Sequence, residues 1–514
     1  MDEDCESRGA EPQVSALPPK MAGAMRGLTK VVSYNQDFVN VNSRRVPQST
    51  SVERMTNEEL MMMMSSGAWM GDTDAQVVSE GDGEIMADGH YAQEFSEAIA
   101  TRKLVIIMVG LPARGKTHIA KQLQRYLNWI GFCTEIFNVG NYRRENVGAY
   151  QTADFFDASN SENVTVRIDL AKQCLDDMLT WLLSSDANVA IYDATNATRQ
   201  RREWIIEPLD RHGLRYMFLE SVCTDPKLVE QNVVKTKLFS PDYVGVNPEE
   251  AVADFMQRIR MYELVYETID AENTEKVPYI KTINTGKQII VNCIRGYIPG
   301  KLVSYLLNAH IMSRDIYLSR HGESEWNVTG QLGGDPALTA RGRRYSRVLA
   351  EFVRTEFLEQ GKPMPLVWTS QLRRTRQTVE LIPTMHTCWR ALNEINAGVC
   401  EGMTYETVAQ QMPDIAAQRK ADKLRFRYPQ GESYVDVIHR LEPVILELER
   451  QRGSVLIVAH NAVIRSIYAY FMSLSRESCT TVEIPLHTII KLSPQPYGCE
   501  ATRYELDVDG EETA

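Results

Sequence analysis

The sequence lacks the features that mark several protein classes. Its nine cysteines include no CxxC pair, so neither a structural zinc site nor a disulfide framework is expected. Its longest apolar run, residues 104–111, is far shorter than the roughly 20 residues that span a bilayer. The first residues, MDEDCESRGAEP, are acidic and polar, unlike a secretory signal or a transit peptide. We therefore expect a cytoplasmic protein without a membrane partner.

Positive charge is also in short supply over the chain as a whole. Its 514 residues carry 68 acidic and 56 basic side chains, a net charge of −12. This balance argues against a nucleic-acid partner and against docking on an anionic membrane. However, residues 1–100 hold 17 acidic and 7 basic side chains, and residues 101–514 hold 51 and 49. The acidity belongs to the first fifth of the chain, so the remainder is free to bind anionic ligands.

The pattern along the chain indicates an extension followed by two α/β domains. Residues 1–100 are rich in Ser, Gly and acidic residues without clear periodicity, which predicts a disordered extension. In the next part, strands are expected at 104–109, 188–192 and 214–219, with a helix at 117–130. The pattern restarts near residue 313, with strands at 316–319, 366–369 and 455–459 and helices at 339–355, 371–381 and 462–472. Strands that alternate with helices predict parallel sheets with helices on both faces, in domains 101–313 and 314–514.

A phosphate-binding loop is predicted directly after the first strand. Residues 110–117 read GLPARGKT, which fits GxxxxGK[ST] between a strand and a helix. In such a loop the backbone N–H groups surround phosphate oxygens, Lys116 reaches the β- and γ-phosphates, and Thr117 ligates Mg²⁺. Asp193 ends a neighbouring strand, where it is placed to hold the water shell of the metal. The structural alternatives are a glycine-rich turn for the loop and a helix cap for Asp193.

The same domain offers cationic side chains for a phosphorylated acceptor. The guanine-reading NKxD motif of GTPases is absent from the sequence. Arginine binds phosphate through paired hydrogen bonds. Eight arginines follow the loop in this domain: Arg143, Arg144, Arg167, Arg199, Arg201, Arg202, Arg258 and Arg260. The alternative for most of them is a solvated helix face, but together they favour a small phosphorylated acceptor.

The second domain carries residues suited to a different phosphate chemistry. His321 follows a strand next to Arg320, and His460 ends another strand. A neutral imidazole can attack phosphorus, and Arg320 and Arg374 would neutralise the phosphoryl oxygens. Glu394 is a candidate proton donor for the leaving group. A structural role remains the alternative for either histidine taken alone.

These motifs together resemble the bifunctional 6-phosphofructo-2-kinase/fructose-2,6-bisphosphatase family over about residues 103–505. The matching strings include MVGLPARGKT, YRRE, YDATN, SPDY, RHGES and RYPQGESY. The resemblance implies a P-loop kinase-type parallel-sheet domain followed by a histidine-phosphatase domain similar to phosphoglycerate mutase. It implies an enzyme that makes fructose 2,6-bisphosphate from fructose 6-phosphate and ATP and hydrolyses it through a phosphohistidine, thereby regulating glycolysis and gluconeogenesis. It further implies Mg²⁺ with ATP, no prosthetic group and a homodimer.

The resemblance assigns residues of the kinase half one by one. Lys116, Asp193, Cys223 and Lys237 match active-site positions, and Lys237 matches a lysine that stabilises the transferring phosphoryl group. The implied ATP site is Gly110, Leu111, Pro112, Ala113, Arg114, Gly115, Lys116, Thr117, Asn232, Lys237 and Tyr497. The implied fructose 6-phosphate site is Arg143, Arg167, Thr195, Arg201, Arg258 and Tyr262.

In the phosphatase half, the resemblance implies that His321 is the nucleophile and Glu394 the general acid and later base, with His460 beside them. The implied fructose 2,6-bisphosphate site is Arg320, Asn327, Gly333, Arg374, Tyr405, Arg419, Lys423, Tyr434, Asn461 and Arg465. Asn461 departs from the family pattern, which usually has Gln there, one methylene longer. Asn396 and Gly402 are further departures near Glu394.

Two other functional interpretations fit the sequence less well. A histidine phosphatase fused to an unrelated P-loop kinase is disfavoured by YRRE, SPDY and RYPQGESY. A regulator with dead sites is disfavoured because Lys116, Asp193, His321, Glu394 and His460 are all present. A mainly monofunctional member of the family, with one activity weak or lost, remains the alternative.

The 1–100 extension has no counterpart in the family pattern. Arg44 and Arg45 lie upstream of Ser49, Thr50 and Ser51, which is a weak cue for a basophilic protein kinase. A regulatory segment and an inert solvated tail both remain open.

Overall fold

The computed structural model describes residues 28–31 and 103–509, except for residues 150, 158, 185, 235–240, 244, 271–276, 285, 311–313 and 496–497. Lys237, Tyr497 and the expected domain boundary at 313 therefore lie outside the described residues, as does the 1–100 extension apart from residues 28–31.

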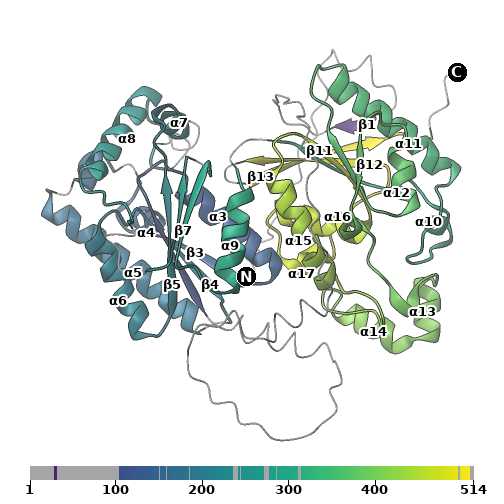
Figure 1. The fold of residues 1–514 in the computed structure, drawn as a ribbon, viewed down its shortest axis with the longest axis horizontal. Helices are drawn as coiled ribbons and strands as arrows, with labels where there is room; N and C mark the ends of the chain where they lie inside the picture. The colour runs from purple at the N-terminus through teal and green to yellow at the C-terminus, as the bar shows by residue number, and fades with distance from the viewer. Residues whose placement is uncertain are drawn as a thin grey trace, which may run out of the picture. The chain divides into compact units, whose positions relative to one another are not determined.

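The first domain is built on a six-stranded sheet. The strand order is β3-β4-β2-β5-β6-β7, and all neighbours are parallel except β6 and β7 (Figure 1). The strands are β2 (Leu104–Val109), β3 (Thr134–Asn138), β4 (Val189–Asp193), β5 (Arg215–Val222), β6 (Tyr279–Ile283) and β7 (Gln288–Asn292). Because β2, β3, β4 and β5 run in parallel, their carboxyl ends meet at one edge, where α/β proteins bind ligands.

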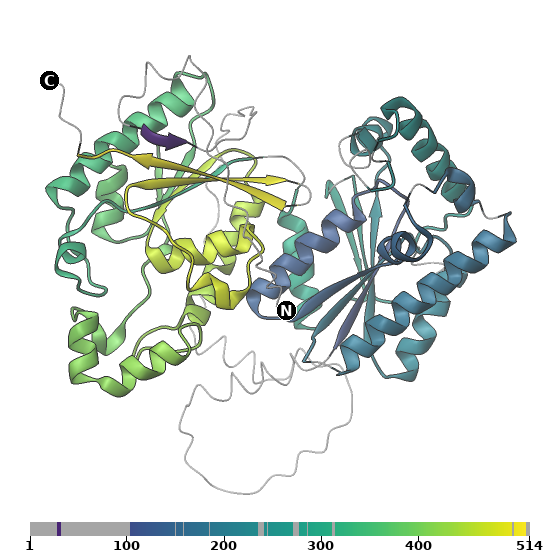
Figure 2. The ribbon, with the colours of Figure 1, turned by 180° about the vertical axis from the view of Figure 1, so that it is seen from behind.

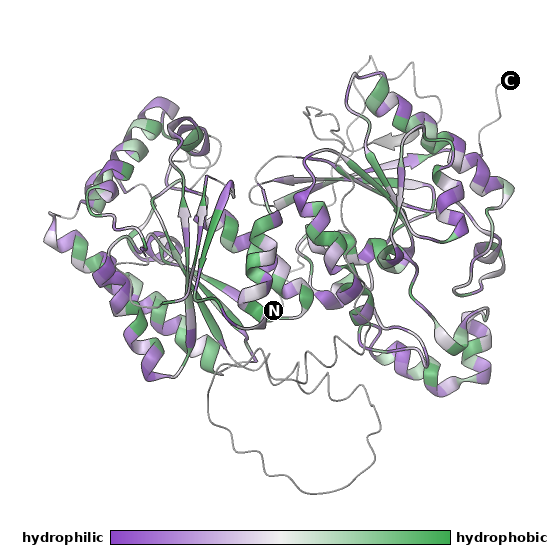
Figure 3. Ribbon diagram, viewed as in Figure 1, coloured by the Kyte–Doolittle hydropathy of each residue, from purple (hydrophilic) through white to green (hydrophobic). Residues whose placement is uncertain are grey.

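The central strand β2 shows why helices cover both faces of this sheet. Its six residues are all buried. Leu104, Ile106 and Met108 belong to the hydrophobic cluster that contains residues of α3 (Lys116–Ile130). The residues between them belong to the cluster that contains residues of α5 (Ser161–Ser184). Alternate side chains of a strand point to opposite faces, so a continuous apolar run needs a helix layer on each side. Figure 3 shows green hydrophobic strands between helices that carry both colours.

The second domain has a seven-stranded sheet in the order β1-β13-β12-β8-β11-β9-β10. The strands are β1 (Leu28–Val31), β8 (Ile316–Arg320), β9 (Leu366–Thr369), β10 (His386–Cys388), β11 (Val455–Ala459), β12 (Thr488–Gln495) and β13 (Gly498–Leu506). The four strands β8 to β11 are parallel, and the β12–β13 hairpin and β1 add antiparallel strands (Figure 2). The turns that follow β8, β9 and β11 therefore leave the sheet from the same edge.

The remaining helices of the first domain are α4 (Val139–Val147), η1 (Ala153–Phe156), α6 (Arg199–Arg211), α7 (Pro226–Asn232), α8 (Pro248–Glu263) and α9 (Tyr297–Asn308). Those of the second domain are α10 (Glu325–Thr329), α11 (Ala340–Val353), η3 (Arg354–Leu358), α12 (Arg373–Val379), η4 (Arg390–Leu392), η5 (Gly398–Cys400), α13 (Tyr405–Gln411), α14 (Pro413–Ala421), α15 (Tyr434–Arg450), α16 (Asn461–Phe471) and α17 (Arg476–Cys479).

A buried carboxylate joins α3 of the first domain to α15 and α16 of the second. Glu449 on α15 accepts hydrogen bonds from Arg125 on α3 at 2.7 Å and from Arg314 at 2.9 Å. Tyr470 on α16 also donates to Glu449, at 2.7 Å. Burial alone would raise the pKa of Glu449, but Arg125 and Arg314 outweigh it and lower this pKa to about 2. The buried Glu449 is therefore a carboxylate held by cations from both sides.

The structure confirms the predicted order of strands and helices. Strands expected at 188–192 and 214–219 are observed as β4 and β5 with slightly shifted ends, and the helix expected at 371–381 is shorter, as α12. The antiparallel β1, β7, β12 and β13 were not predicted, because nothing in their sequence marks the direction of pairing. Strand β1 lies within the segment that was expected to be disordered. In the part of the chain that the structure describes, no helix is both long and apolar enough to cross a bilayer.

Candidate active sites

The loop between β2 and α3 is shaped by glycine at both ends. Gly110 has φ of +138°, and a side chain there would place Cβ 2.5 Å from the carbonyl oxygen of Ser221 on β5. Gly115 has φ of +84° and directly precedes Lys116, the first residue of α3. Only glycine adopts these conformations without strain. The loop therefore turns tightly against the sheet and ends at a helix N-terminus, where backbone N–H groups and the helix dipole attract anions.

Two hydrogen bonds converge on Asp193 at the end of β4. Thr117 Oγ1 donates to Asp193 Oδ2 at 2.7 Å, and Asn138 Nδ2 donates to the same oxygen at 2.5 Å. Asp193 is only 2% exposed. Lys116, at the start of α3, donates to the carbonyl oxygen of Leu111 at 2.7 Å, so its ammonium lies across the phosphate loop. The predicted pair of Thr117 and Asp193 is thus brought together by two strands and one helix.

A cluster of arginines surrounds one buried carboxylate in the same domain. Arg143 on α4 donates from Nη2 to both oxygens of Asp242, at 2.7 and 2.6 Å. Arg144 and Arg258 lie 3.5 and 4.0 Å from Asp242 Oδ2. The guanidinium of Arg258 also stacks over the ring of Phe156, with its carbon 3.5 Å from the ring centre. Burial lowers the pKa of Arg258, and the neighbouring Arg143 adds to that effect. More cationic charge is gathered here than one carboxylate neutralises.

Two of the other predicted arginines, Arg167 and Arg201, are anchored through neutral partners, whereas Arg199 pairs with the carboxylate of Glu203. Arg167 on α5 donates to the carbonyl oxygens of Phe156 and Asp157, at 2.8 and 2.9 Å. Arg201 on α6 donates to Tyr192 Oη at 3.1 Å and lies over the ring of Trp204. Neutral acceptors leave the positive charge of both guanidinium groups available to an anion.

One cavity of about 2220 Å³ unites these groups. Most of the residues predicted for this domain line it: Pro112, Ala113, Arg114, Gly115, Lys116, Thr117, Arg143, Arg167, Asp193, Thr195, Arg201, Cys223, Asn232, Arg258 and Tyr262. Gly110 and Leu111 begin the loop that forms part of its wall. Asn232 Nδ2 donates to the carbonyl oxygen of Ala113 at 3.1 Å and so contacts the loop directly. Cys223 is buried, and its thiol contacts the carbonyl oxygen of Asp225 within its own turn.

In the second domain, the turns after β8, β9 and β11 bring two histidines and an arginine together. The rings of His321 and His460 have their centres 5.1 Å apart. Arg374 Nε donates to His321 Nε2 at 3.1 Å, and His321 Nδ1 lies 2.7 Å from the carbonyl oxygen of Gly322. A carbonyl only accepts, so Nδ1 carries the proton and Nε2 holds a lone pair. His460 Nε2 is paired with Ser370 Oγ at 2.8 Å.

Both histidines are held in the neutral form. Burial lowers the pKa of His321 well below 6.5, and Arg374 and Arg320 lower it further. Burial also lowers the pKa of His460 well below 6.5, with added repulsion from Arg374, His321 and Arg320. Neutral imidazole is the nucleophilic form, so the lone pair on His321 Nε2 is available at neutral pH.

Cationic side chains form the other end of this second site. Arg419 donates to the hydroxyls of Tyr405 and Tyr428 at 2.9 and 2.7 Å, and Arg465 donates to Tyr434 at 3.2 Å. Lys423 donates to the carbonyl oxygen of Thr480 at 2.8 Å. Burial, together with Arg465 and Arg419, lowers the pKa of Lys423 to about 8. Like charges held this close indicate a subsite for an anion.

A cavity of about 270 Å³ connects the two ends. The predicted residues that line it are Arg320, His321, Asn327, Gly333, Arg374, Glu394, Tyr405, Arg419, Lys423, Tyr434, Asn461 and Arg465. His460 is fully buried against His321. The Oδ1 atom of Asn461 is buried and has no hydrogen-bond partner among the described residues. Glu394 acts electrostatically on Arg320 and Arg374, so it lies on the same side as the histidines.

Several residues of the two sites were not predicted from the sequence. Asn138 and Ser370 could have been suspected, because each lies at the end of a strand at the ligand-binding edge. Asp242 lies in the matching string SPDY, but the sequence does not show the partners of Asp242 or Arg440, because these partners are distant in sequence. Their roles depend on contacts that only the folded chain creates.

Comparisons with known proteins match each of the two domains to a family. Residues 91–313 match the family model described as 6-phosphofructo-2-kinase, and residues 316–507 match the histidine phosphatase superfamily, branch 1. A protein of Gallus gallus named 6-phosphofructo-2-kinase/fructose-2,6-bisphosphatase is 46% identical over 409 residues, which cover 80% of this chain and 86% of that protein. A Homo sapiens protein named 6-phosphofructo-2-kinase/fructose-2,6-bisphosphatase 4 is 46% identical over 404 residues, covering 79% of this chain and 85% of that protein.

The neutral state of the two histidines is open to a direct test. Because their folded pKa values lie well below 6.5, we expect the His321 and His460 side-chain NMR signals to stay unchanged from about pH 8 to about pH 6. In the urea-unfolded chain the same signals should titrate near pH 6.5. The neutral histidines therefore contribute stability that is lost as pH falls below about 6.5. A midpoint at or above 6.5 in the folded protein would contradict the assignment.

Proposed function

The chain belongs to the bifunctional 6-phosphofructo-2-kinase/fructose-2,6-bisphosphatase family, and from this premise we propose how its residues carry the two reactions. It is a bifunctional enzyme that makes fructose 2,6-bisphosphate from fructose 6-phosphate and ATP, and hydrolyses it to fructose 6-phosphate and phosphate. We assign the kinase to residues 101–313, the phosphatase to residues 314–514 and a regulatory extension to residues 1–100. The observation that carries the assignment is that the residues expected in each domain gather at the carboxyl ends of its parallel strands, in two cavities with different lining residues. Glu449 and Tyr470 of the second domain also line the larger cavity.

In the kinase, the 2-hydroxyl oxygen of fructose 6-phosphate attacks the γ-phosphorus of ATP, and the bond to the β-phosphate oxygen breaks to release ADP. The proton of the hydroxyl passes to water, since the transfer relies on positioning and charge neutralisation. The loop of residues 110–117 holds the ATP phosphates, and Lys116 neutralises charge that develops on the oxygens. The arginines Arg143, Arg167, Arg201 and Arg258, with Thr195 and Tyr262, hold the acceptor sugar phosphate. The excess of cations around Asp242 supports a dianionic phosphate at this place.

The donor set at Thr117 and Asp193 fits Mg²⁺. A hydroxyl and a carboxylate are oxygen ligands of the kind that this ion prefers, and they lie 2.7 Å apart at the end of the phosphate loop. When bound with ATP, Mg²⁺ supplies charge neutralisation at the phosphates. Asn138 would hold the Asp193 carboxylate in place through its hydrogen bond. We retain Lys237, Cys223, Asn232 and Tyr497 as further members of the kinase site on the strength of the family resemblance.

In the phosphatase, His321 Nε2 attacks the phosphorus of the 2-phosphate, and the bond from phosphorus to sugar oxygen O2 breaks. Glu394 gives its proton to O2, so fructose 6-phosphate leaves as an alcohol. Glu394 then takes a proton from the water that attacks the phosphohistidine, which releases phosphate and regenerates His321. Arg320, Arg374 and His460 surround the transferring group, and the Nδ1–H bond to Gly322 keeps Nε2 aimed at phosphorus.

The far end of the phosphatase cavity is proposed to hold the sugar and its 6-phosphate. Arg419, Lys423 and Arg465 supply the positive charge, with Tyr405 and Tyr434 holding two of them in place. Asn327 and Gly333 contribute loop contacts. The unpartnered Oδ1 of Asn461 supports a role for this shorter amide in contacting substrate, in place of the usual Gln.

We also propose a cytoplasmic location and a homodimer. All eight described cysteines are free thiols, which supports a reducing compartment, and cell fractionation would test it. Strand β7 lies at the edge of the kinase sheet, with Ile290 and Val291 37% and 45% exposed. An exposed apolar edge strand offers backbone groups for pairing with a second copy.

The Lys116→Met variant should separate the two activities. We expect synthesis of fructose 2,6-bisphosphate from ATP and fructose 6-phosphate to fall at least about a hundredfold, because Lys116 no longer neutralises the phosphates. Phosphatase activity should stay within about twofold of wild type, because it uses another cavity. Failure of the wild-type enzyme to form the product would refute the kinase assignment, and loss of both activities in folded protein would refute separate sites.

The His321→Ala variant should lose the covalent intermediate. With fructose 2,6-bisphosphate labelled in the 2-phosphate, the wild-type enzyme should take up acid-labile label, and the variant should take up none. Hydrolysis should fall by about a thousandfold or more, because no other group replaces the nucleophile. Kinase activity serves as the control for folding. Label that still accumulates on the variant would show that another residue is the nucleophile.

A charge placed on the edge strand should disrupt the dimer. We expect wild-type protein to sediment at twice the chain mass of 58.4 kDa, and Val291→Lys to shift it toward the monomer. Leu381→Lys, at an exposed apolar residue of the phosphatase domain, is the matched control and should remain dimeric. A wild-type monomer at micromolar concentration would exclude the homodimer.

A further inference from the structure

The proposed proton donor Glu394 lies on a loop with little secondary structure of its own. Only the short helices η4 and η5 interrupt residues 390–400, on either side of Glu394. Among the described residues, the Glu394 carboxylate has a single hydrogen-bond donor, the backbone N–H of Ile395, which lies 3.0 Å from Oε1. The position of this carboxyl therefore depends on whatever holds the loop backbone.

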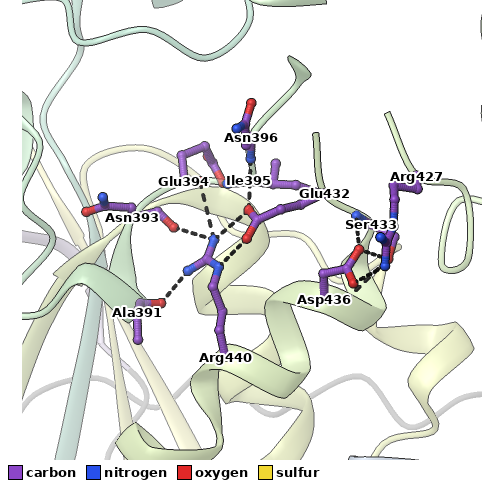
Figure 4. A network of polar contacts seen from close by, with 10 residues as sticks. All are labelled: Ala391, Asn393, Glu394, Ile395, Asn396, Arg427, Glu432, Ser433, Asp436 and Arg440. Carbon is purple, nitrogen blue, oxygen red and sulfur yellow. Dashed lines mark hydrogen bonds and ion pairs between the residues drawn. The ribbon is translucent and has the colours of Figure 1, made fainter. Parts of the chain in front are cut away.

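One side chain from outside the loop binds its backbone at three points. Arg440, in the middle of α15, donates to the carbonyl oxygens of Ala391, of Asn393 at 2.8 Å and of Glu394 at 3.3 Å (Figure 4). The guanidinium is planar and presents five donors in a fixed arrangement. It can therefore satisfy three carbonyls at once and fix their relative orientation.

Glu432 binds this guanidinium and also binds the loop backbone on the other side of Glu394. Arg440 Nε donates to Glu432 Oε1 at 2.8 Å, and Nη2 donates to Oε2 at 3.1 Å. The same Oε2 accepts from the backbone N–H of Asn396 at 3.0 Å, and the N–H of Glu432 donates to the carbonyl oxygen of Asn396 at 2.9 Å. Arg440 and Glu432 thus bind the loop immediately before and after Glu394 (Figure 4).

A hydrogen bond also connects the loop to the turn that carries two partners of the histidines. Asn393 Oδ1 accepts from the backbone N–H of Gln371 at 2.9 Å, in the turn between Ser370 and Arg374. Ser370 pairs with His460, and Arg374 pairs with His321. The loop that carries Glu394 is therefore braced between α15 and the histidine pair.

We infer that Arg440, fixed by Glu432, is a positioning residue that sets the Glu394 carboxyl for proton transfer in the phosphatase. This inference rests on the proposed role of Glu394 as general acid. Arg440 does not line the cavity, and its hydrogen bonds reach the reacting groups through the loop. Its charge also contributes to the low pKa of His460, and Arg440→Lys keeps that charge. A shift of about 1 Å in a catalytic group can cost a hundredfold in rate, so the expected effect is on kcat and not on substrate binding.

The test measures the rate at which the 2-phosphate of fructose 2,6-bisphosphate is transferred to His321, by rapid-quench kinetics. It compares Arg440→Lys with wild type. Lysine keeps the charge, but its single ammonium has three donors and cannot reach the three carbonyls and both carboxylate oxygens of Glu432 at once. We therefore expect a loss of about ten- to a hundredfold in kcat with KM within about twofold. Arg450→Lys is the matched control, because Arg450 lies on the same helix in an exposed pair with Glu447 and should behave as wild type. Kinase activity and thermal unfolding report on folding.

A double-mutant cycle distinguishes positioning from a general structural role. Glu394→Gln alone should slow transfer by about a hundredfold or more, and adding Arg440→Lys should then change the rate by less than about twofold. If Arg440→Lys does not fold, Glu432→Gln takes its place with the same expectation. Equal losses in both backgrounds, or an unchanged rate in Arg440→Lys, would overturn the inference while the proposed role of Glu394 stands. No effect of Glu394→Gln alone would overturn that role, and the inference with it.

Discussion

Pairing of buried guanidinium groups is the constraint on which both active sites depend. A charge taken out of water is costly unless partners replace its hydration. Each site must nevertheless keep several arginines out of bulk water before any phosphate binds. Arg143 is hydrogen-bonded to Asp242, Arg374 to the Gly334 carbonyl oxygen, and Arg440 to Glu432. The contact between α3 and α15 follows the same rule, with Glu449 as the shared carboxylate.

The partners differ in a way that matters for function. Where the arginine is to bind a ligand, its partners are mostly neutral carbonyls and hydroxyls, or one carboxylate shared among several cations. Arg440, which holds the fold, is instead paired with a carboxylate of its own, Glu432. The ligand sites are therefore left with excess positive charge, as the low pKa of Lys423 indicates. The net charge of −12 for the whole chain conceals this local excess.

Each domain places its reacting groups at the carboxyl edge of its own parallel strands, although the two reactions are unrelated. In the kinase the catalytic groups follow β2 and β4, and in the phosphatase they follow β8, β9 and β11. The two sites are nevertheless physically connected. Helix α3 begins at the phosphate loop and contacts α15 and α16, and α16 begins directly after His460. Each reaction thus has its own cavity, and the helices that begin at the two cavities share a buried contact.

The amino-acid sequence by itself determined the order of the domains, the central strands and many of the residues that line the two cavities. These features are local: a glycine loop between a strand and a helix, or a histidine that ends a strand, is visible in consecutive residues. The antiparallel strands, the tautomer of His321, and the roles of Asp242 and Arg440 could not be read in this way. They depend on partners as far apart in sequence as Arg143 and Asp242, or Arg440 and Ala391. Only the tertiary structure decided them. A charge needs a partner when it is buried, and it becomes buried only when the chain folds.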